Sequence, residues 1–335
     1  MRIQLGFVPL ADCAPLVAAH ELGHFRREGL EVELRKIQSW PQLLSRLQEG
    51  MLEGAHLLST LPVLVAAGAP GIEAPLCTAW TLSSSANAIT LSNRLWKDGV
   101  ACAEDLARWL EANPGVRLHF GIVLPRSSQE LCLREWLARG GLEIGERIEL
   151  VTCPPQEMTR RLREDLLDGF CSGEPWNQRA ATSKLGGIVA LGDSLLPGAP
   201  EKVLAVRGSW HQKEPQAHAA LLRALATASA WLEDPCNLEQ ASRMLADKSH
   251  VNTQEPLLRS ALERRLQAGW KRTMESDGFL RFTGVNAPAE PGFRYLLERL
   301  VWWGHLPSTA LETDLRRVCL EDFHREVFEP LGGRA

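Results

Sequence analysis

Short apolar segments alternate with amphipathic ones along much of this chain, and this alternation most restricts the folds that it can adopt. The segment RIQLGFV at residues 2–8 reads as a strand, residues 15–28 read as a helix, and LEVELRKI at 30–37 reads as a second strand. The segments AHLLS at 55–59 and RLHFGIV at 117–123 continue the series. Strands that alternate with helices are typical of an α/β protein with a mostly parallel sheet.

The length of the chain favours two lobes. Its 335 residues exceed the roughly 100–200 that one domain usually holds, and no repeat or low-complexity linker divides them. From about residue 209 the pattern becomes mainly helical. We therefore predict that the chain crosses between lobes near residues 91 and 207, with residues 1–90 and 208–335 in lobe I and residues 91–207 in lobe II.

Charge and hydropathy exclude several classes of protein. The chain carries 37 basic and 41 acidic residues, a net charge of −4, without a block of Lys and Arg, so we expect no direct contact with nucleic acid. No apolar run approaches the roughly 18 residues of a membrane helix, and the first residues do not resemble a secretory signal. Eight dispersed cysteines without a CxxC motif suit a reducing compartment, and we expect a cytoplasmic protein.

Motifs of common enzymes are missing from the sequence. It holds no GxSxG, GxxxxGK[ST], HExxH or GxGxxG pattern. His20 and His24 have the i,i+4 spacing of metal ligands, but beside Glu21 and Arg26 they also fit a solvated helix face. We therefore expect no enzymatic activity, no cofactor and no resident metal.

Three polar residues at the ends of predicted strands or helices are candidates for ligand binding. Trp40 follows the second strand, where its indole N–H, which can only donate, would suit an anion; the alternative is a packing residue at a helix entry. Gln129 opens a helix behind Ser127 and Ser128, and the alternative is a plain capped helix. Lys202, in Pro-Glu-Lys-Val, would supply a positive charge, or it is an ordinary surface lysine.

In order, these segments resemble the nitrate-binding proteins of the nitrate/bicarbonate ABC-transporter group. The resemblance covers nearly the whole chain, and its most specific parts are the opening GFVPLADCAPL and the later GEPWN. The matching blocks lie at residues 6–34, 39–40, 55–58, 87–91, 133–137, 173–177, 200–204 and 303–304. The resemblance implies a two-lobed, Venus-flytrap fold of the type II periplasmic-binding-protein class that binds a small oxyanion.

The resemblance also implies a ligand set of Trp40, Asn87, Gln129 and Lys202. Asn87 stands where the family usually has Gln, and Gln129 where it has His. Nitrate has only acceptor oxygens, and these four side chains offer donors and one positive charge. Bicarbonate-type members have an acid near the lysine position, so Lys202 favours nitrate or nitrite.

Three functional classes share this fold. The expected one is a cytoplasmic nitrate/nitrite sensor of the NasS type, which holds an RNA-binding antiterminator of the NasT type until the ligand arrives. The alternative is the substrate-binding component of a nitrate ABC transporter. A thiamine-pyrimidine synthase would require a clustered Cys motif, which the sequence lacks.

Overall fold

The computed structural model describes residues 1–71, 74–269 and 271–329, which form two compact units. Unit 1 is built from residues 1–84, 198–252 and 281–335, and unit 2 from residues 85–197 and 253–280. These divisions differ from the predicted lobes, because the chain passes from one unit to the other four times. Residues 253–280, which we expected in lobe I, pack with unit 2 through α14 (Glu255–Leu262) and strand β11 (Arg265–Gly269).

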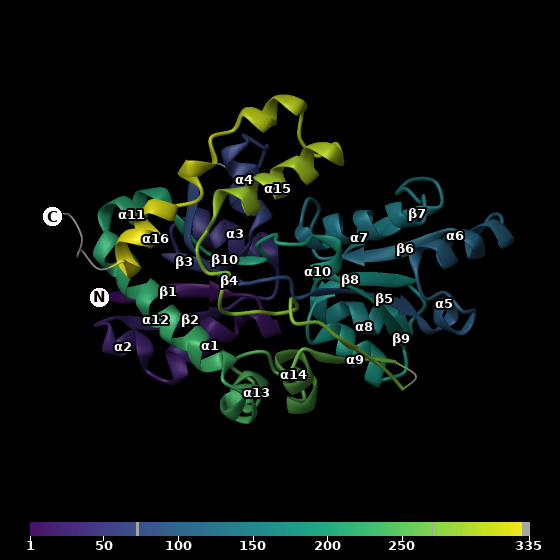
Figure 1. Ribbon diagram of the computed structural model, residues 1–335, viewed down its shortest axis with the longest axis horizontal. Coiled ribbons are helices and arrows are strands. Elements are labelled where there is room, and N and C mark those ends of the chain that lie inside the picture. The colour runs from purple at the N-terminus through teal and green to yellow at the C-terminus, as the bar shows by residue number, and fades with distance from the viewer. Residues whose placement is uncertain (72–73, 270, 330–335) are drawn as a thin grey trace. The chain divides into compact units, whose positions relative to one another are not determined.

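The sheet of unit 1 has the strand order β2-β1-β3-β10-β4. Strand β1 pairs parallel with β2 and β3, whereas β10 pairs antiparallel with β3 and β4 (Figure 1). The sheet is therefore mixed, with β10 as the one reversed strand among these five. Its strands are β1 (Arg2–Phe7), β2 (Glu31–Lys36), β3 (Gly54–Leu58), β4 (Leu76–Ser83) and β10 (Lys202–Arg207).

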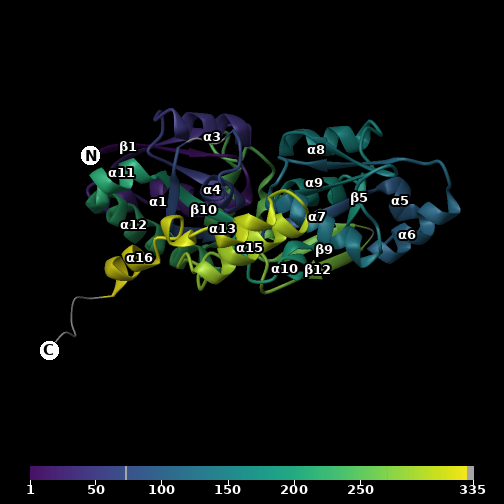
Figure 2. The same cartoon turned by 90° about the horizontal axis from the view of Figure 1, so that it is seen from above.

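The helices of unit 1 cover both faces of this sheet. Helices α3 and α4 lie on one side of the strands, and α1 and α12 lie on the other (Figure 1). The C-terminal helix α16 lies beside α12 and β4 (Figures 1 and 2). The helices are α1 (Ala14–Glu21), α2 (His24–Arg27), α3 (Trp40–Gln48), α4 (Thr60–Ala66), α11 (Gly208–Lys213), α12 (Pro215–Glu233), α13 (Leu238–Ala246), α15 (Glu290–Trp302) and α16 (Glu321–Phe328), with short 3-10 turns η1 (Ala11–Cys13), η2 (Pro235–Asn237), η3 (Ser308–Glu312) and η4 (Leu315–Arg317).

Unit 2 repeats this plan with the strand order β7-β6-β8-β5-β9. Strand β6 is parallel to β7 and β8, and β5 is the reversed strand. Helix α7 lies on one side of the sheet, and α8 and α9 on the other (Figure 1). The remaining elements are β5 (Asn87–Ser92), α5 (Asn93–Lys97), α6 (Ala103–Ala112), β6 (Leu118–Ile122), α7 (Ser128–Arg139), β7 (Ile148–Thr152), α8 (Pro155–Arg163), β8 (Gly169–Gly173), α9 (Trp176–Thr182), β9 (Gly186–Leu191), α10 (Gly192–Leu195) and β12 (Arg272–Glu275).

The reversed strands correct the predicted placement of two candidate residues. We expected Lys202 in lobe II, but it begins β10, which pairs with β3 and β4 of unit 1. We expected Asn87 in lobe I, but it begins β5, which pairs with β8 and β9 of unit 2. In both cases hydrogen bonding to strands distant in the sequence decides the placement.

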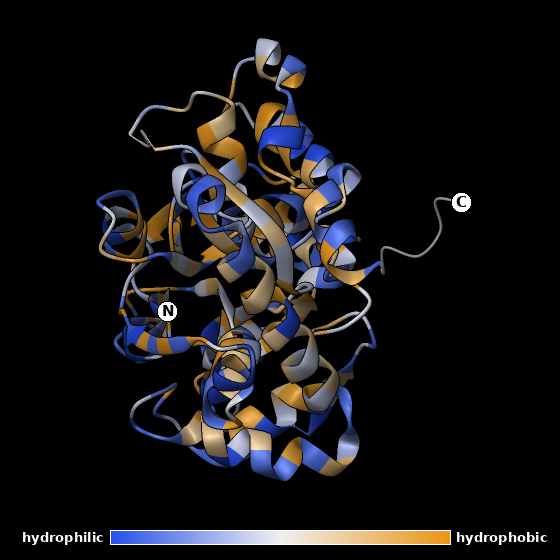
Figure 3. Cartoon of the chain, turned by 90° about the vertical axis from the view of Figure 1, so that its left-hand side faces the viewer, coloured by the Kyte–Doolittle hydropathy of each residue, from blue (hydrophilic) through white to orange (hydrophobic). Residues whose placement is uncertain are grey.

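Burial follows the hydrophobic pattern of the chain. Every residue of β4 and β5 is buried, whereas the helices carry hydrophilic residues on their outer sides (Figure 3). In α3 the apolar residues Trp40, Leu43, Leu44 and Leu47 are buried, as the spacing of an amphipathic helix requires. No helix among the described residues has the length and apolar character needed to span a lipid bilayer.

Candidate functional site

Lys202 is buried on one face of the unit 1 sheet, with a side-chain exposure of 0%. Leu204, two residues further along β10, pairs with His56 of β3, and Lys202 itself pairs with Leu58. Paired residues share a face, as do residues two apart on a strand, so Lys202 and His56 project from the same face. The alternative of an exposed surface lysine is therefore excluded.

Two carboxylates contact the ammonium group of Lys202. Its Nζ atom lies 3.0 Å from Oδ2 of Asp12, in the turn after β1, and it donates a hydrogen bond to Oε1 of Glu201. The other Asp12 oxygen, Oδ1, lies 2.9 Å from Nε2 of His56. These four side chains, which we call the lysine cluster (Asp12, His56, Glu201 and Lys202), are all buried.

Trp40 lies beside the lysine cluster. It is the first residue of α3, where the extended backbone of Ser39 and the following Pro41 favour a helix start. The Lys202 Nζ lies 5.6 Å from the centroid of the Trp40 ring, and the His56 ring centroid lies at the same distance of 5.6 Å. Trp40 is 1% exposed, and its Nε1 has no hydrogen-bond partner among the described residues. Trp40 thus packs in the interior while its N–H group lacks an acceptor among the residues that the structure describes.

The charges of the cluster stabilise one another. Burial alone would raise the pKa of Asp12, but the charges and hydrogen bonds of Lys202 and His56 outweigh it and lower this pKa to about 2. Burial acts to lower the pKa of Lys202. The negative charges and hydrogen bonds of Asp12 and Glu201 outweigh burial, and the pKa of Lys202 lies above its ordinary value. Asp12 is therefore ionised and Lys202 is protonated near neutral pH.

The two amide candidates meet within unit 2. Nε2 of Gln129 donates a hydrogen bond of 2.7 Å to Oδ1 of Asn87, and both side chains are buried. Ser127 accepts a hydrogen bond from the backbone N–H of Glu130 and so caps α7, as predicted. The Nδ2 group of Asn87 has no hydrogen-bond partner among the described residues, so the pair retains a donor.

Glu174 is a buried carboxylic acid next to the strand residue that pairs with Asn87. It directly follows Gly173, which pairs with Asn87 across strands β8 and β5. Its Oε2 accepts a hydrogen bond of 3.1 Å from the backbone N–H of Gln178. Burial raises the pKa of Glu174 to about 8, against the lowering effect of its hydrogen bonds. This carboxyl group is therefore mostly protonated at pH 7.

The structure brings together Trp40 with Lys202 in unit 1 and Asn87 with Gln129 in unit 2. Sequence reasoning did not assign a role to Asp12, His56, Glu201 or Glu174. A signal was present, because each of these ionisable residues interrupts an apolar segment or lies within a block that carries the resemblance. Among the described residues, no group of three or more His, Cys, Asp and Glu side chains is placed to hold a metal ion.

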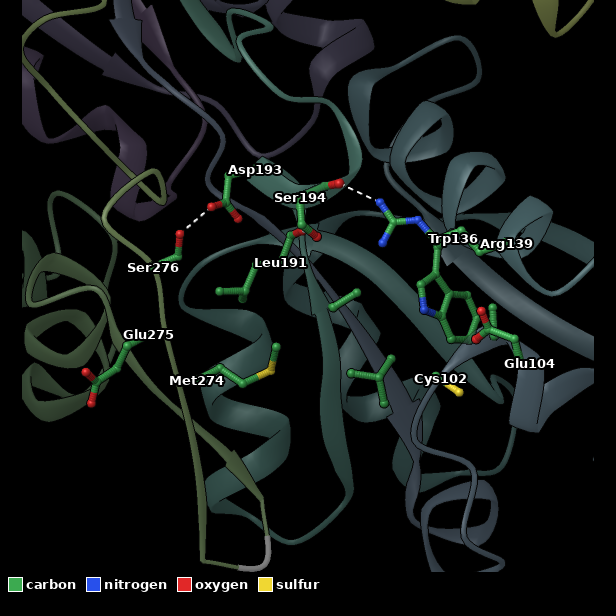
Figure 4. A pocket seen from close by; sticks show the side chains of 13 residues that line it. Cys102, Glu104, Trp136, Arg139, Leu191, Asp193, Ser194, Met274, Glu275 and Ser276 are labelled. Atoms are coloured by element: carbon green, nitrogen blue, oxygen red, sulfur yellow. Dashed lines mark hydrogen bonds between the residues drawn. The ribbon is translucent and has the colours of Figure 1, made fainter.

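Unit 2 also contains a separate hollow of about 400 Å³ that none of the predicted residues lines. Trp136, Leu191 and Met274 form apolar parts of its wall (Figure 4). At its rim Ser276 donates a hydrogen bond to Asp193, and Arg139 donates one to the backbone carbonyl of Ser194. Ser276 and Arg139 are therefore already engaged in hydrogen bonds within unit 2.

Comparisons with known proteins agree with this architecture. The sequence profile of the NMT1-like family matches residues 1–246. The crystal structure of the periplasmic nitrate-binding protein NrtA from Synechocystis PCC 6803 superposes with a TM-score of 0.91 at 26% identity, covering 99% of this chain and 89% of that one. This similarity confirms the predicted two-lobed α/β fold of the periplasmic-binding-protein class.

Curated relatives carry names from two kinds of anion import. The nitrate/nitrite binding protein NrtA of Synechococcus elongatus is 31% identical over 98% of this chain and 78% of its own. The nitrate import ATP-binding protein NrtC of Synechocystis is 34% identical over 99% of this chain, and the bicarbonate transport ATP-binding protein CmpC of Synechococcus elongatus is 32% identical over 95%. The chain spans only about half the length of these two ATP-binding relatives, 50% and 48%.

Proposed function

This chain belongs to the NMT1-like family, and from that premise we propose that it binds nitrate or nitrite as the substrate-binding component of an anion importer. It is a relative of the nitrate/bicarbonate ABC-transporter binding proteins and belongs with binding proteins rather than with enzymes. The import role comes from the names of its relatives. The ligand assignment rests on the chemistry of the buried groups.

The observation that carries the ligand assignment is the buried ammonium of Lys202 beside the indole N–H of Trp40, which finds no acceptor in the described part of the chain. A buried donor without an acceptor costs free energy, which a bound acceptor would recover. A planar oxyanion supplies such acceptors, and a charge-assisted hydrogen bond contributes roughly 1.5–3 kcal/mol. An anion-binding role for the Asn87 and Gln129 amides of unit 2 stays a proposal.

The ammonium of Lys202 only donates hydrogen bonds, and nitrate and nitrite have only acceptor atoms. Bicarbonate also carries an O–H group, which needs an acceptor, so Lys202 favours nitrate and nitrite. The carboxylates of Asp12 and Glu201 modify this argument, since either could accept a hydrogen bond from the O–H of bicarbonate. The ligand test must therefore include all three anions.

Isothermal titration calorimetry with nitrate, nitrite and bicarbonate tests this proposal. We expect Lys202→Gln to weaken nitrate binding about 10- to 100-fold, because it removes the positive charge. Trp40→Phe keeps the ring but loses the N–H donor, and we expect a smaller loss of about 5- to 10-fold.

Lys213→Gln, which alters an exposed lysine of the same unit, is the matched control and should bind as the unmodified protein does. Circular dichroism establishes that each variant is folded. Undiminished nitrate binding by folded Lys202→Gln and Trp40→Phe would remove the site assignment.

The second candidate is the cytoplasmic sensor that sequesters a NasT-type antiterminator. It is supported by the sequence resemblance and the dispersed cysteines, whereas the names of the relatives favour import. Native mass spectrometry with a co-encoded antiterminator separates the two roles. A complex that nitrate dissociates supports the sensor, and failure to form any complex leaves import as the better explanation.

A further inference from the structure

We propose that the side-chain hydroxyl of Ser83 is a further anion contact of the Lys202 site. This inference rests on the proposed function and adds to it a residue of β4, a strand that contributes none of the four predicted ligand residues. It arises from the pairing of β4 with β10 and from a buried hydroxyl group that finds no partner among the described residues.

Strand pairing places Ser83 beside Lys202. Ser83 is the last residue of β4 and pairs with Lys202, the first residue of β10, while Leu58 of β3 pairs with Lys202 from the other side. The backbone N–H of Glu201 donates to the Ser83 carbonyl at 3.2 Å and so joins the two strand ends. Directly paired residues of antiparallel strands project their side chains from the same face of the sheet. The Ser83 hydroxyl therefore lies on the face that carries the ammonium of Lys202.

The Ser83 hydroxyl is fully buried, and its oxygen has no hydrogen-bond partner in the described part of the chain. Serine hydroxyls close to it in the structure are engaged. The Ser84 hydroxyl accepts from the backbone N–H of Arg281 at 2.9 Å, and the Ser59 hydroxyl donates to the carbonyl of Pro200 at 2.6 Å. Because a buried hydroxyl without a partner costs free energy, a ligand that supplies the missing hydrogen bond would recover this cost.

Lys202 and Trp40 offer the other donors of this site. An ammonium group has three N–H bonds, and Asp12 and Glu201 each accept one from Lys202. The third N–H has no acceptor within the ranges that the structure describes, and neither has the indole N–H of Trp40. Nitrate has three acceptor oxygens and no donor, so the Ser83 hydroxyl complements the ammonium and the indole as a third kind of donor.

A ligand contact and a structural role of Ser83 predict different effects on stability. If the hydroxyl held the strand ends together, Ser83→Ala would destabilise the protein in the absence of any anion. Because the hydroxyl has no partner among the described residues, we expect Ser83→Ala without anion to be at least as stable as the unmodified protein. A loss of affinity without a loss of stability is thus the signature of a ligand contact.

Isothermal titration calorimetry with nitrate, together with urea unfolding in nitrate-free buffer, tests this inference. We expect Ser83→Ala to raise the Kd for nitrate about 3- to 10-fold, the range of one neutral hydrogen bond. Ser83→Gly removes the same hydroxyl and should raise the Kd by a similar factor, which keeps the test valid if Ser83→Ala fails to fold.

Ser229→Ala is the matched control. Ser229 is also a buried serine of unit 1 whose hydroxyl has no partner among the described residues, but it belongs to α12, on the side of the sheet opposite α3 (Figure 1). Its substitution should leave the Kd for nitrate unchanged.

Each outcome decides the inference. Undiminished nitrate binding by folded Ser83→Ala, when Lys202→Gln binds weakly, overturns it and leaves the proposed function standing. Equal weakening by Ser229→Ala overturns it as well, because the effect would then come from packing in unit 1. A Ser83→Ala variant that is destabilised without anion would assign Ser83 to strand pairing instead. An unmodified protein that binds neither nitrate nor nitrite contradicts the proposed function itself, and this inference with it.

Discussion

At the residue scale, Glu174 illustrates how burial controls the charge of a side chain. Its pKa of about 8 in the folded protein compares with 4.5 for an ordinary glutamate. Between pH 4.5 and about pH 8 the Glu174 carboxyl group is ionised in the unfolded chain but protonated in the folded chain. The free energy of unfolding must therefore fall as pH rises through this range. The free energy of unfolding should drop by about 1.4 kcal/mol per pH unit in that window, and level off above about pH 8.

Glu174→Gln should remove this pH dependence while keeping an oxygen to accept the Gln178 N–H. Urea unfolding at several pH values between 5 and 8 measures the difference between the two proteins, which we expect to widen with pH. Glu146→Gln, at an exposed position of unit 2, should show no such divergence. Parallel curves for Glu174→Gln and the unmodified protein would mean that Glu174 is ionised when folded.

The candidate residues themselves were only partly predictable. An indole at a helix entry and a lysine just before a predicted crossing are visible in the sequence, and so is the resemblance that links them. The contacts of Asp12 with Lys202 and His56 were not, because these residues come from segments up to about 190 residues apart and local patterns do not report such contacts.

At the element scale, the cap of α7 positions Gln129 within its first turn. Ser127 is the residue before the helix, and its hydroxyl accepts from the Glu130 N–H at 3.3 Å. We expect Ser127→Ala to destabilise the protein by about 1 kcal/mol in urea unfolding followed by far-UV circular dichroism. Ser127→Thr keeps a hydroxyl and should lose less. Equal losses for both variants would point to packing rather than capping.

Other elements show where periodicity succeeds and where it fails. The strands predicted at 2–8 and 30–37 are confirmed by β1 and β2. The helix predicted at 15–28 is divided into α1 and α2, because Gly23 adopts a left-handed φ of 73°. The hairpin of β11 and β12 was not predicted, since strands of five and four residues leave little pattern to detect.

At the scale of the whole molecule, a ligand that binds only the folded chain must stabilise it. Nitrate at a hundred times its Kd should add about 2.7 kcal/mol to the free energy of unfolding, and so raise the Tm by a few degrees. Differential scanning fluorimetry in nitrate and in chloride of equal ionic strength measures this effect. Equal Tm values in the two salts would contradict nitrate binding, and Lys202→Gln should show a reduced shift.

The sequence by itself determined the α/β class, most of the strands and helices, and the family to which the chain belongs, because periodicity and local motifs are properties of neighbouring residues. Only the tertiary structure decided that Lys202 joins the sheet of unit 1 and Asn87 that of unit 2. Strand pairing across long stretches of chain made those choices. The same pairing buried Lys202 between two carboxylates, and so set the charge balance that any bound anion must meet.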